Sequence, residues 1–170
     1  WGAISVGAIA AYFAYKNLAK KRELPAFGYF LDALAPGILL AQAIGRLGNW
    51  FNGELFGRPT NLPWALQIPP DLRPDNYAKY LTFHPTFLYE LIWCTILAVV
   101  LIVWGKKLVA GQVFSAYVAL YSVGRLFIEI IRIDEANTIA GLRVNVWISA
   151  IVASLALLNY LRLGRTSAKI

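Results

Sequence analysis

The 170-residue sequence contains no methionine, a single cysteine and a single histidine. One cysteine excludes an internal disulfide. The lack of methionine leads us to expect that Trp1 is not a native start and that the chain is trimmed at its N-terminus. Charged residues make up 15% of the chain, hydrophobic residues make up 59%, and the mean hydropathy is +0.57. Because soluble proteins carry about 25% charged residues, these values exclude an ordinary soluble domain and predict one integral membrane domain over residues 1–170.

Apolar residues gather in five segments, which are Trp1–Tyr15, Pro25–Phe51, Thr86–Trp104, Val113–Ile131 and Val144–Leu161. A helix needs about 20 residues to cross the apolar core of a bilayer, and all of these segments except the first approach that length. We therefore predict an all-α fold, a polytopic transmembrane bundle of about five helices. The long connection at residues 52–85 is rich in Pro, Asn and Asp, and it is predicted to be an extramembrane loop.

Basic residues follow the first, third and fifth segments. These three clusters hold nine of the sixteen Lys and Arg residues: Lys16, Lys20, Lys21 and Arg22; Lys106 and Lys107; Arg162, Arg165 and Lys169. Five crossings would bring all three clusters to one side, which the positive-inside rule makes cytoplasmic. Residues 52–85 and 132–143 are then extracytoplasmic. The net charge of +7 is explained by topology and attraction to anionic lipid, so nucleic acid is not an expected partner.

A polar stretch, GRLGNWFNGELFGR at residues 45–58, ends the second segment. Polar side chains at a membrane boundary cost free energy unless they have a function, and glycine lets the backbone approach another group closely. On a helix Gln42, Arg46 and Asn49 share an arc of about 60°. The stretch is typical of a site for an anionic head group. The alternative is that Arg46 reaches the surface or pairs with an acid on another helix.

The fourth segment carries a second polar face, because Tyr121, Arg125, Glu129 and Arg132 share an arc of about 80° on a helix. One interpretation is an intrahelical salt bridge between Arg125 and Glu129. The other is an anion site, since two arginines beside one glutamate leave a surplus of positive charge that suits phosphate oxygens.

The third polar group, HPTFLYE at residues 84–90, lies at the outer start of the third segment. His84 is either a functional group or a structural cap, and Glu90 could pair with Arg46 or Arg58. The predicted topology brings all three polar groups to the outer face. Asp32, near the inner end of the second segment, is expected to face a basic residue of the cytoplasmic loop.

Three motifs carry a resemblance to a known family. Residues 45–54 (GRLGNWFNGE), 84–90 (HPTFLYE) and 124–132 (GRLFIEIIR) resemble, in order and spacing, the motifs of bacterial prolipoprotein diacylglyceryl transferases. The resemblance covers essentially the whole chain. Because members of that family usually have seven helices, it implies that this chain is the C-terminal five-helix portion.

The resemblance implies a reaction and its participants. The family transfers a diacylglyceryl group from phosphatidylglycerol to the lipobox cysteine thiol of a prolipoprotein signal peptide, forming a thioether and releasing glycerol phosphate. It also implies a multi-pass protein of the bacterial plasma (inner) membrane, with its active site toward the extracytoplasmic face. No metal or other cofactor is expected, and the partners are membrane lipid and the prolipoprotein.

Site residues follow from the same resemblance. The catalytic candidates are Arg46, Glu54, His84, Arg125 and Glu129. The substrate-binding candidates are Arg46, Asn49, Asn52, Gly57, Tyr121, Arg125 and Arg132. The chain departs from the family at Trp1-Gly2-Ala3, where many members have His-Gly-Gly. Two rival hypotheses are a lipid transporter, which would need polar residues through the full membrane depth, and a non-catalytic lipid-binding scaffold.

Overall fold

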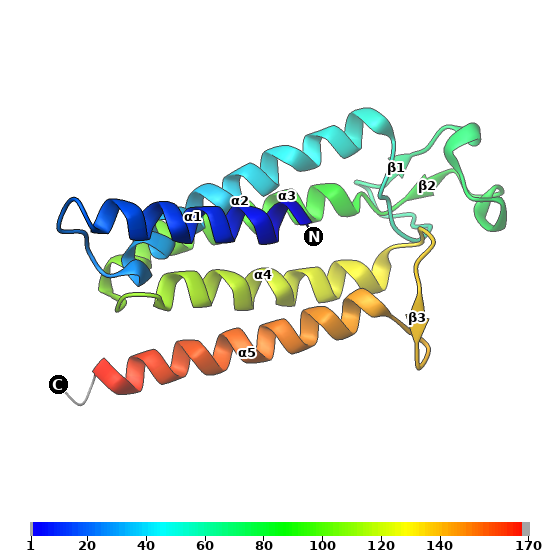
Figure 1. Cartoon of the computed structure of the whole chain (residues 1–170). Helices are drawn as coiled ribbons and strands as arrows, with labels where there is room; N and C mark the ends of the chain where they lie inside the picture. The colour runs from blue at the N-terminus through cyan, green and yellow to red at the C-terminus, as the bar shows by residue number, and fades with distance from the viewer. Residues whose placement is uncertain (1, 168–170) are drawn as a thin grey trace.

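The computed structural model describes residues 2–167, which form five α-helices (Figure 1). Their bounds are α1 Gly2–Ala19, α2 Phe27–Asn52, α3 Thr86–Trp104, α4 Gln112–Ile131 and α5 Val144–Ser167. The predicted all-α bundle is confirmed, with boundaries close to those of the apolar segments. Within residues 2–167, the four helices α2 to α5 are long and apolar enough to cross a membrane, whereas α1 does not meet that measure.

Successive helices run in alternating directions, so the connections gather at two ends of the bundle (Figure 1). One end carries the segment between α2 and α3 and the segment between α4 and α5. The other end carries the turn after α1 and the turn between α3 and α4, which includes the short 3-10 helix η3 at Gly105–Lys107. This is the grouping of connections that the basic clusters predicted.

The core joins α2, α3 and α4. Fully buried Ala35 and Leu39 of α2 pack with Cys94 and Ala98 of α3 and with Tyr117 of α4. Small side chains allow helix backbones to approach closely inside a membrane, where packing rather than the hydrophobic effect holds helices together. The core therefore fixes the three helices that carry the predicted polar motifs.

Asp32 joins α2 to the start of α4, and the prediction that it faces a basic residue is wrong. Its Oδ2 accepts the backbone N–H of Gly111 at 2.7 Å and its Oδ1 accepts that of Phe114 at 2.8 Å. The first N–H groups of a helix lack partners in their own chain and carry partial positive charge, so a carboxylate from another helix satisfies them. Gly28 makes this approach possible, because a Cβ there would lie 2.8 Å from the backbone of Ala110.

The connection between α2 and α3 is folded rather than irregular. Strand β1 (Leu66–Gln67) pairs antiparallel with β2 (Thr82–Phe83), and the 3-10 helices η1 (Pro70–Leu72) and η2 (Asp75–Tyr77) lie between them. Phe56, Ile68 and Phe83 form its own buried apolar cluster. The sequence predicted an extramembrane loop here but not this internal core.

The second connection is a hairpin of β3 (Thr138–Ile139) and β4 (Leu142–Arg143). Its turn residues Ala140 and Gly141 both have positive φ, 51° and 77°, which suits a tight two-residue turn. The two connections touch, because Gly57 and Arg132 form an isolated antiparallel β-bridge. They therefore form one structured cap over this end of the bundle.

Candidate functional site

Glu90 is the point where α2, α3 and α4 meet. Its Oε1 lies 3.1 Å from Nη2 of Arg46 and accepts the hydroxyl of Tyr121 at 2.9 Å, while its Oε2 lies 3.0 Å from Nη1 of Arg125. The Glu90 side chain is 3% exposed. A buried carboxylate is tolerated when it is paired and hydrogen-bonded, and here α2 contributes one partner and α4 contributes two. The alternative in which Arg46 pairs with an acid on another helix is thus confirmed.

Glu129, fully buried, forms the second node of the network. Its Oε2 lies 2.7 Å from Nη2 of Arg125, which confirms the intrahelical salt bridge that was one of two interpretations of this face, and 3.9 Å from Nη1 of Arg132. Its Oε1 accepts hydrogen bonds from Nε of Arg143 at 2.8 Å and from Nδ2 of Asn145 at 3.0 Å. Arg125 therefore bridges two buried carboxylates, one on α3 and one on α4.

Asp134 closes the network at its outer edge. Arg132 binds it through two parallel hydrogen bonds, Nε to Oδ1 at 2.7 Å and Nη2 to Oδ2 at 2.8 Å, and Nη2 of Arg143 donates to Oδ2 at 2.9 Å. Burial acts to raise the pKa of Asp134, but the hydrogen bonds and charges of Arg132 and Arg143 outweigh it and hold that pKa below its ordinary value. The carboxylate is therefore ionised at neutral pH.

The whole network carries the same surplus of one positive charge that the sequence predicted for one face of α4. The network contains four guanidinium groups and three carboxylates, from Arg46, Arg125, Arg132, Arg143, Glu90, Glu129 and Asp134. One positive charge remains in excess. Periodicity on a single helix could not count Glu90 of α3 or Asp134 of the α4–α5 connection, and their two negative charges offset the two positive charges of Arg46 and Arg143.

Glu54 organises the turn that ends α2. Its Oε1 accepts Nδ2 of Asn49 and Nδ2 of Asn52, both at 3.1 Å, and Nη1 of Arg46 donates to Oδ1 of Asn49 at 3.3 Å. The hydrogen bonds from Asn52 and then Asn49 lower the pKa of Glu54. The two asparagines therefore hold Glu54 in place and tie it through Asn49 to Arg46.

Two residues that flank Glu54 have a left-handed backbone conformation. Gly53 ends α2 with φ of 62°, as is common for glycine after a helix. Leu55 also has positive φ, 58°, a conformation that costs a branched residue about 1–3 kcal/mol. Thr86 at the start of α3 donates its hydroxyl to the Leu55 carbonyl, which helps to hold this strained residue.

Gly57 occupies a packed position rather than an open one. It is buried, and a Cβ there would lie 2.7 Å from Cγ2 of Ile131 and 2.9 Å from Cγ2 of Thr86. Its N–H donates to the carbonyl of His84 at 2.8 Å. The structure therefore places this predicted substrate-binding residue where it brings three segments together.

A narrow cleft runs between the network and the turn, and we call it the arginine cleft. It is lined by Arg46, Asn49, Leu55, Thr86, Phe87, Glu90, Arg125, Ile128 and Arg132, and it is closed, with no room for a water-sized molecule. Nε of Arg46 is buried there without a hydrogen-bond partner among residues 2–167. A buried donor left without a partner costs about 1–3 kcal/mol, so the cleft is one acceptor short. An anionic oxygen would satisfy it.

His84 lies beside the cleft rather than in its lining. Its Nδ1 is 3.0 Å from the hydroxyl of Tyr89, which also accepts Nε1 of Trp64 at 2.9 Å. The imidazole therefore belongs to an aromatic group at the start of α3. The departure from the family at Trp1-Gly2-Ala3 begins at Trp1, which lies outside the described residues.

Sequence reasoning missed three members of the network. Arg143, Asn145 and Asp134 come from the α4–α5 connection and the first turn of α5. The signal available in the sequence was Arg143, which directly precedes the apolar helix α5 on the side opposite the basic clusters. Glu90 had been considered as a partner for Arg46, but its contacts with Tyr121 and Arg125 were not foreseen.

These observations define an α-helical membrane protein with an arginine-rich polar cleft near one end of its bundle. The sequence model of the family described as prolipoprotein diacylglyceryl transferase matches residues 1–162. The chain belongs to this family.

Individual relatives agree with that assignment. Proteins named phosphatidylglycerol–prolipoprotein diacylglyceryl transferase include one from Frankia alni, 52% identical over 89% of this chain and 39% of the relative. The second enzyme of that name from Streptomyces coelicolor is 52% identical over 89% of this chain and 47% of the relative. The relative from Corynebacterium diphtheriae is 47% identical over 98% of this chain and 62% of its own length. The chain thus spans from about two fifths to three fifths of these relatives.

Proposed function

We propose that this chain provides the catalytic portion of a phosphatidylglycerol–prolipoprotein diacylglyceryl transferase. The proposal is supported by the names of the relatives and by one observation in the cleft. That observation is the buried Nε of Arg46, which has no hydrogen-bond partner in the described part of the chain while Arg46 and Arg125 share Glu90. A phosphate oxygen is the acceptor that guanidinium groups favour.

The reaction forms one bond and breaks one bond. The lipobox thiolate attacks the glycerol carbon that carries the phosphate ester, a C–S bond forms, and the C–O bond breaks as its electron pair leaves with glycerol phosphate. Arg46 and Arg125 stabilise the negative charge that develops on the phosphate, with Arg132 at the cleft edge. Glu129 holds Arg125 in position by a direct hydrogen bond. Tyr121 acts indirectly, because it donates to Glu90, which also binds Arg125. Asn49 lines the cleft beside Arg46 and faces the head group, and Glu54, which Asn52 also binds, holds Asn49 in place.

The thiol must lose a proton, because its ordinary pKa is about 8.5. We assign this step to His84. Trp64 can only donate, so it uses one lone pair of the Tyr89 oxygen. When Nδ1–H of His84 donates to the other lone pair, Nε2 is unprotonated and can accept the proton from the thiol.

The cleft must widen for this chemistry. Ligand pockets usually have volumes of about 300–1,000 Å³, whereas the arginine cleft has no room for a water-sized molecule. The strained Leu55 lies in its wall. We propose that movement of the turn at residues 53–57 opens the cleft to lipid.

Location follows from charge. We propose that the protein spans the bacterial plasma membrane with the arginine cleft on the extracytoplasmic side, because the three basic clusters lie at the other end of the bundle. The partners are phosphatidylglycerol and the lipobox segment of a prolipoprotein.

The test uses the full natural protein in phosphatidylglycerol vesicles with a lipobox peptide. Mass spectrometry would follow the diacylglyceryl mass on the cysteine. We expect Arg46→Ala and Arg125→Ala to abolish the product, while Arg162→Ala, an exposed arginine at the far end of α5, leaves it unchanged. Folded protein that binds lipid but yields no thioether would instead support the scaffold hypothesis.

A further inference from the structure

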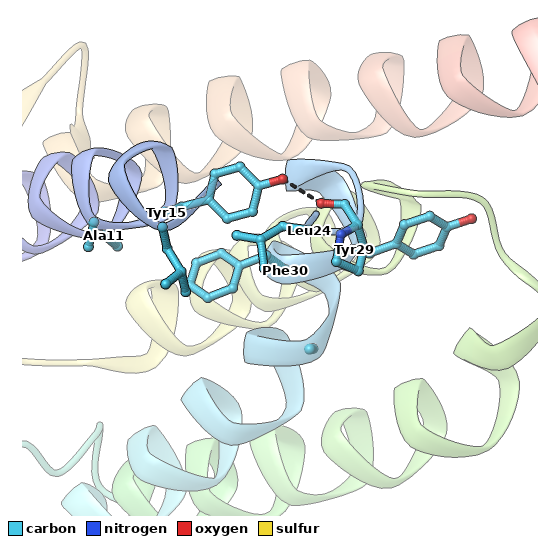
Figure 2. Close-up of a pocket in the computed structure, with 9 residues that line it drawn as sticks. Ala11, Tyr15, Leu24, Tyr29 and Phe30 are labelled. Atoms are coloured by element: carbon cyan, nitrogen blue, oxygen red, sulfur yellow. Dashed lines mark hydrogen bonds between the residues drawn. The ribbon is translucent and has the colours of Figure 1, made fainter. Parts of the chain in front are cut away.

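A second hollow lies between α1 and the first half of α2, and we call it the α1–α2 hollow (Figure 2). Its volume is about 410 Å³, and it is lined by Ala11, Ala14, Tyr15, Leu18, Leu24, Pro25, Tyr29, Phe30 and Ala33. Phe30 precedes Arg46 by sixteen residues, which corresponds to about 24 Å along a helix axis. The hollow is therefore separate from the arginine cleft and lies toward the opposite end of the bundle.

Tyr15 closes one wall of the hollow. Its hydroxyl donates to the carbonyl of Pro25, the contact drawn as a dashed line in Figure 2. Its ring lies 4.9 Å from that of Phe27 and 5.7 Å from that of Phe30, measured between centroids. Tyr29 extends away from Tyr15 and is 53% exposed. Two tyrosines thus frame an otherwise apolar surface, with one hydroxyl bound and the other directed outward.

Positive charge flanks the hollow. Lys20, Lys21 and Arg22 follow the last residue of α1, and the single exposed acid Glu23 separates these three cations from the lining residues Leu24 and Pro25. All three basic side chains are exposed, and none forms an ion pair within residues 2–167. Basic groups of this kind attract anionic lipid with about 1 kcal/mol each. An apolar recess thus opens beside a cluster of cations.

The size of the hollow favours a thin occupant. A helix about 10 Å across fills roughly 400 Å³ with every turn, so the α1–α2 hollow has room for about one turn. A membrane helix of several turns would need a longer groove. An acyl chain fits a narrow apolar recess, and a lipid phosphate would account for the neighbouring cations. An apolar helix would not account for them.

We propose that the α1–α2 hollow is a second lipid site, which holds an acyl chain of an anionic glycerophospholipid while Lys20, Lys21 and Arg22 bind its phosphate. The site goes beyond the proposed transferase function. Its lipid lies at the other end of the bundle from Arg46 and Arg125 and is bound without being converted. It anchors α1 to α2 at the membrane surface where the basic clusters lie.

Native mass spectrometry of the purified chain would test this site, with dioleoyl phosphatidylglycerol and dioleoyl phosphatidylcholine offered at equal concentration. We expect Lys20→Ser/Lys21→Ser to weaken retention of the phosphatidylglycerol at least tenfold. The matched control is Lys106→Ser/Lys107→Ser, which removes the same charge at the same end of the bundle, in η3, outside the lining of the hollow; we expect a change below twofold. Equal losses in the two variants, or equal retention of the two lipids, would overturn the proposal.

A second measurement does not depend on variants. Phosphatidylglycerol with a photoreactive diazirine on its acyl chain should crosslink to residues 11–33 of the chain, and Ala33→Phe, which fills the hollow, should abolish that product. Crosslinks confined to residues 46–58 would show that the hollow holds no lipid. The same outcome in the longer natural protein would overturn the proposal for that protein as well.

These tests are independent of catalysis. Repeating the crosslinking in Arg125→Ala, a change in the arginine cleft, should leave the residue 11–33 product intact. Loss of thioether formation with retained crosslinking would therefore support both proposals. Retained thioether formation without crosslinking at residues 11–33 would remove the second site alone.

Discussion

Glu90 Oε2 lies 3.0 Å from Nη1 of Arg125, and this pair joins α3 to α4 inside the polar end of the bundle. Arg125 also holds Glu129, while Glu90 also holds Arg46 and Tyr121. The two residues therefore lie at the centre of a continuous network of ion pairs that runs from α2 to the α4–α5 connection. Changes to either should affect both the position of the neighbouring arginines and the stability of the bundle.

Glu90→Gln should lower both thermal stability and transfer. The amide keeps one acceptor for Tyr121 but removes the charge that Arg46 and Arg125 share, and breaking a buried ion pair costs about 3–5 kcal/mol. We expect a lower melting temperature in detergent and at least a tenfold loss of transfer rate. The control is Glu135→Gln, an exposed acid near the same end, and similar effects of the two changes would contradict the central role of Glu90.

Asp32→Ala should destabilise the junction of α2 and α4 without altering the arginine cleft. Loss of a helix-capping side chain costs about 1 kcal/mol, and two N–H groups of α4 lose their acceptor here. Asp32→Asn keeps an acceptor and should lie between wild type and Asp32→Ala. Chemical denaturation would measure the order, with Glu23→Ala as an exposed acidic control. Full transfer activity at low temperature is expected for all three variants.

The lowered pKa of Asp134 leads us to predict a specific dependence of the free energy of unfolding on pH. Its pKa in the folded protein is lowered from the ordinary value of 3.8, so the folded state binds its proton less readily than the unfolded state. The stabilisation by Arg132 and Arg143 is then fully present above pH 3.8 and is lost as pH falls through the lower folded value. Thermal unfolding of wild type and Asp134→Asn should differ by a constant amount at neutral pH, and the gap should close in strong acid. A gap that opens on acidification would refute this assignment.

The variant Gly57→Ala should show whether Gly57 is needed for packing or for direct contact with substrate. The new methyl group would overlap Ile131 and Thr86, and such overpacking costs about 1–3 kcal/mol. At Gly45 nothing lies within 4 Å of an added Cβ, and alanine gains about 1 kcal/mol over glycine in a helix. We therefore expect Gly57→Ala to unfold at lower temperature and Gly45→Ala at higher temperature. A stable Gly57→Ala variant with impaired lipid binding would instead favour direct contact with substrate.

Much of the site follows from local sequence spacing. Arg125 and Glu129 are four residues apart, so any helix brings them together, and the structure places them 2.7 Å apart. The pairing of Arg46 with Glu90 was foreseen as one of two alternatives, because topology places the end of α2 beside the start of α3. The family motifs at residues 45–54, 84–90 and 124–132 identified the same end of the bundle.

The sequence by itself determined the class of fold, the helix boundaries and the end of the bundle where polar groups gather, because hydrophobic runs and charge clusters are local properties of the chain. Only the tertiary structure decided the partners of those groups. Asp32 caps α4 rather than facing a lysine, Arg143 completes the shell of Glu129, and Asn49 and Asn52 hold Glu54. Hydrogen bonds act over about 3 Å, so they depend on how segments distant in sequence pack, and no periodicity within one helix contains that information.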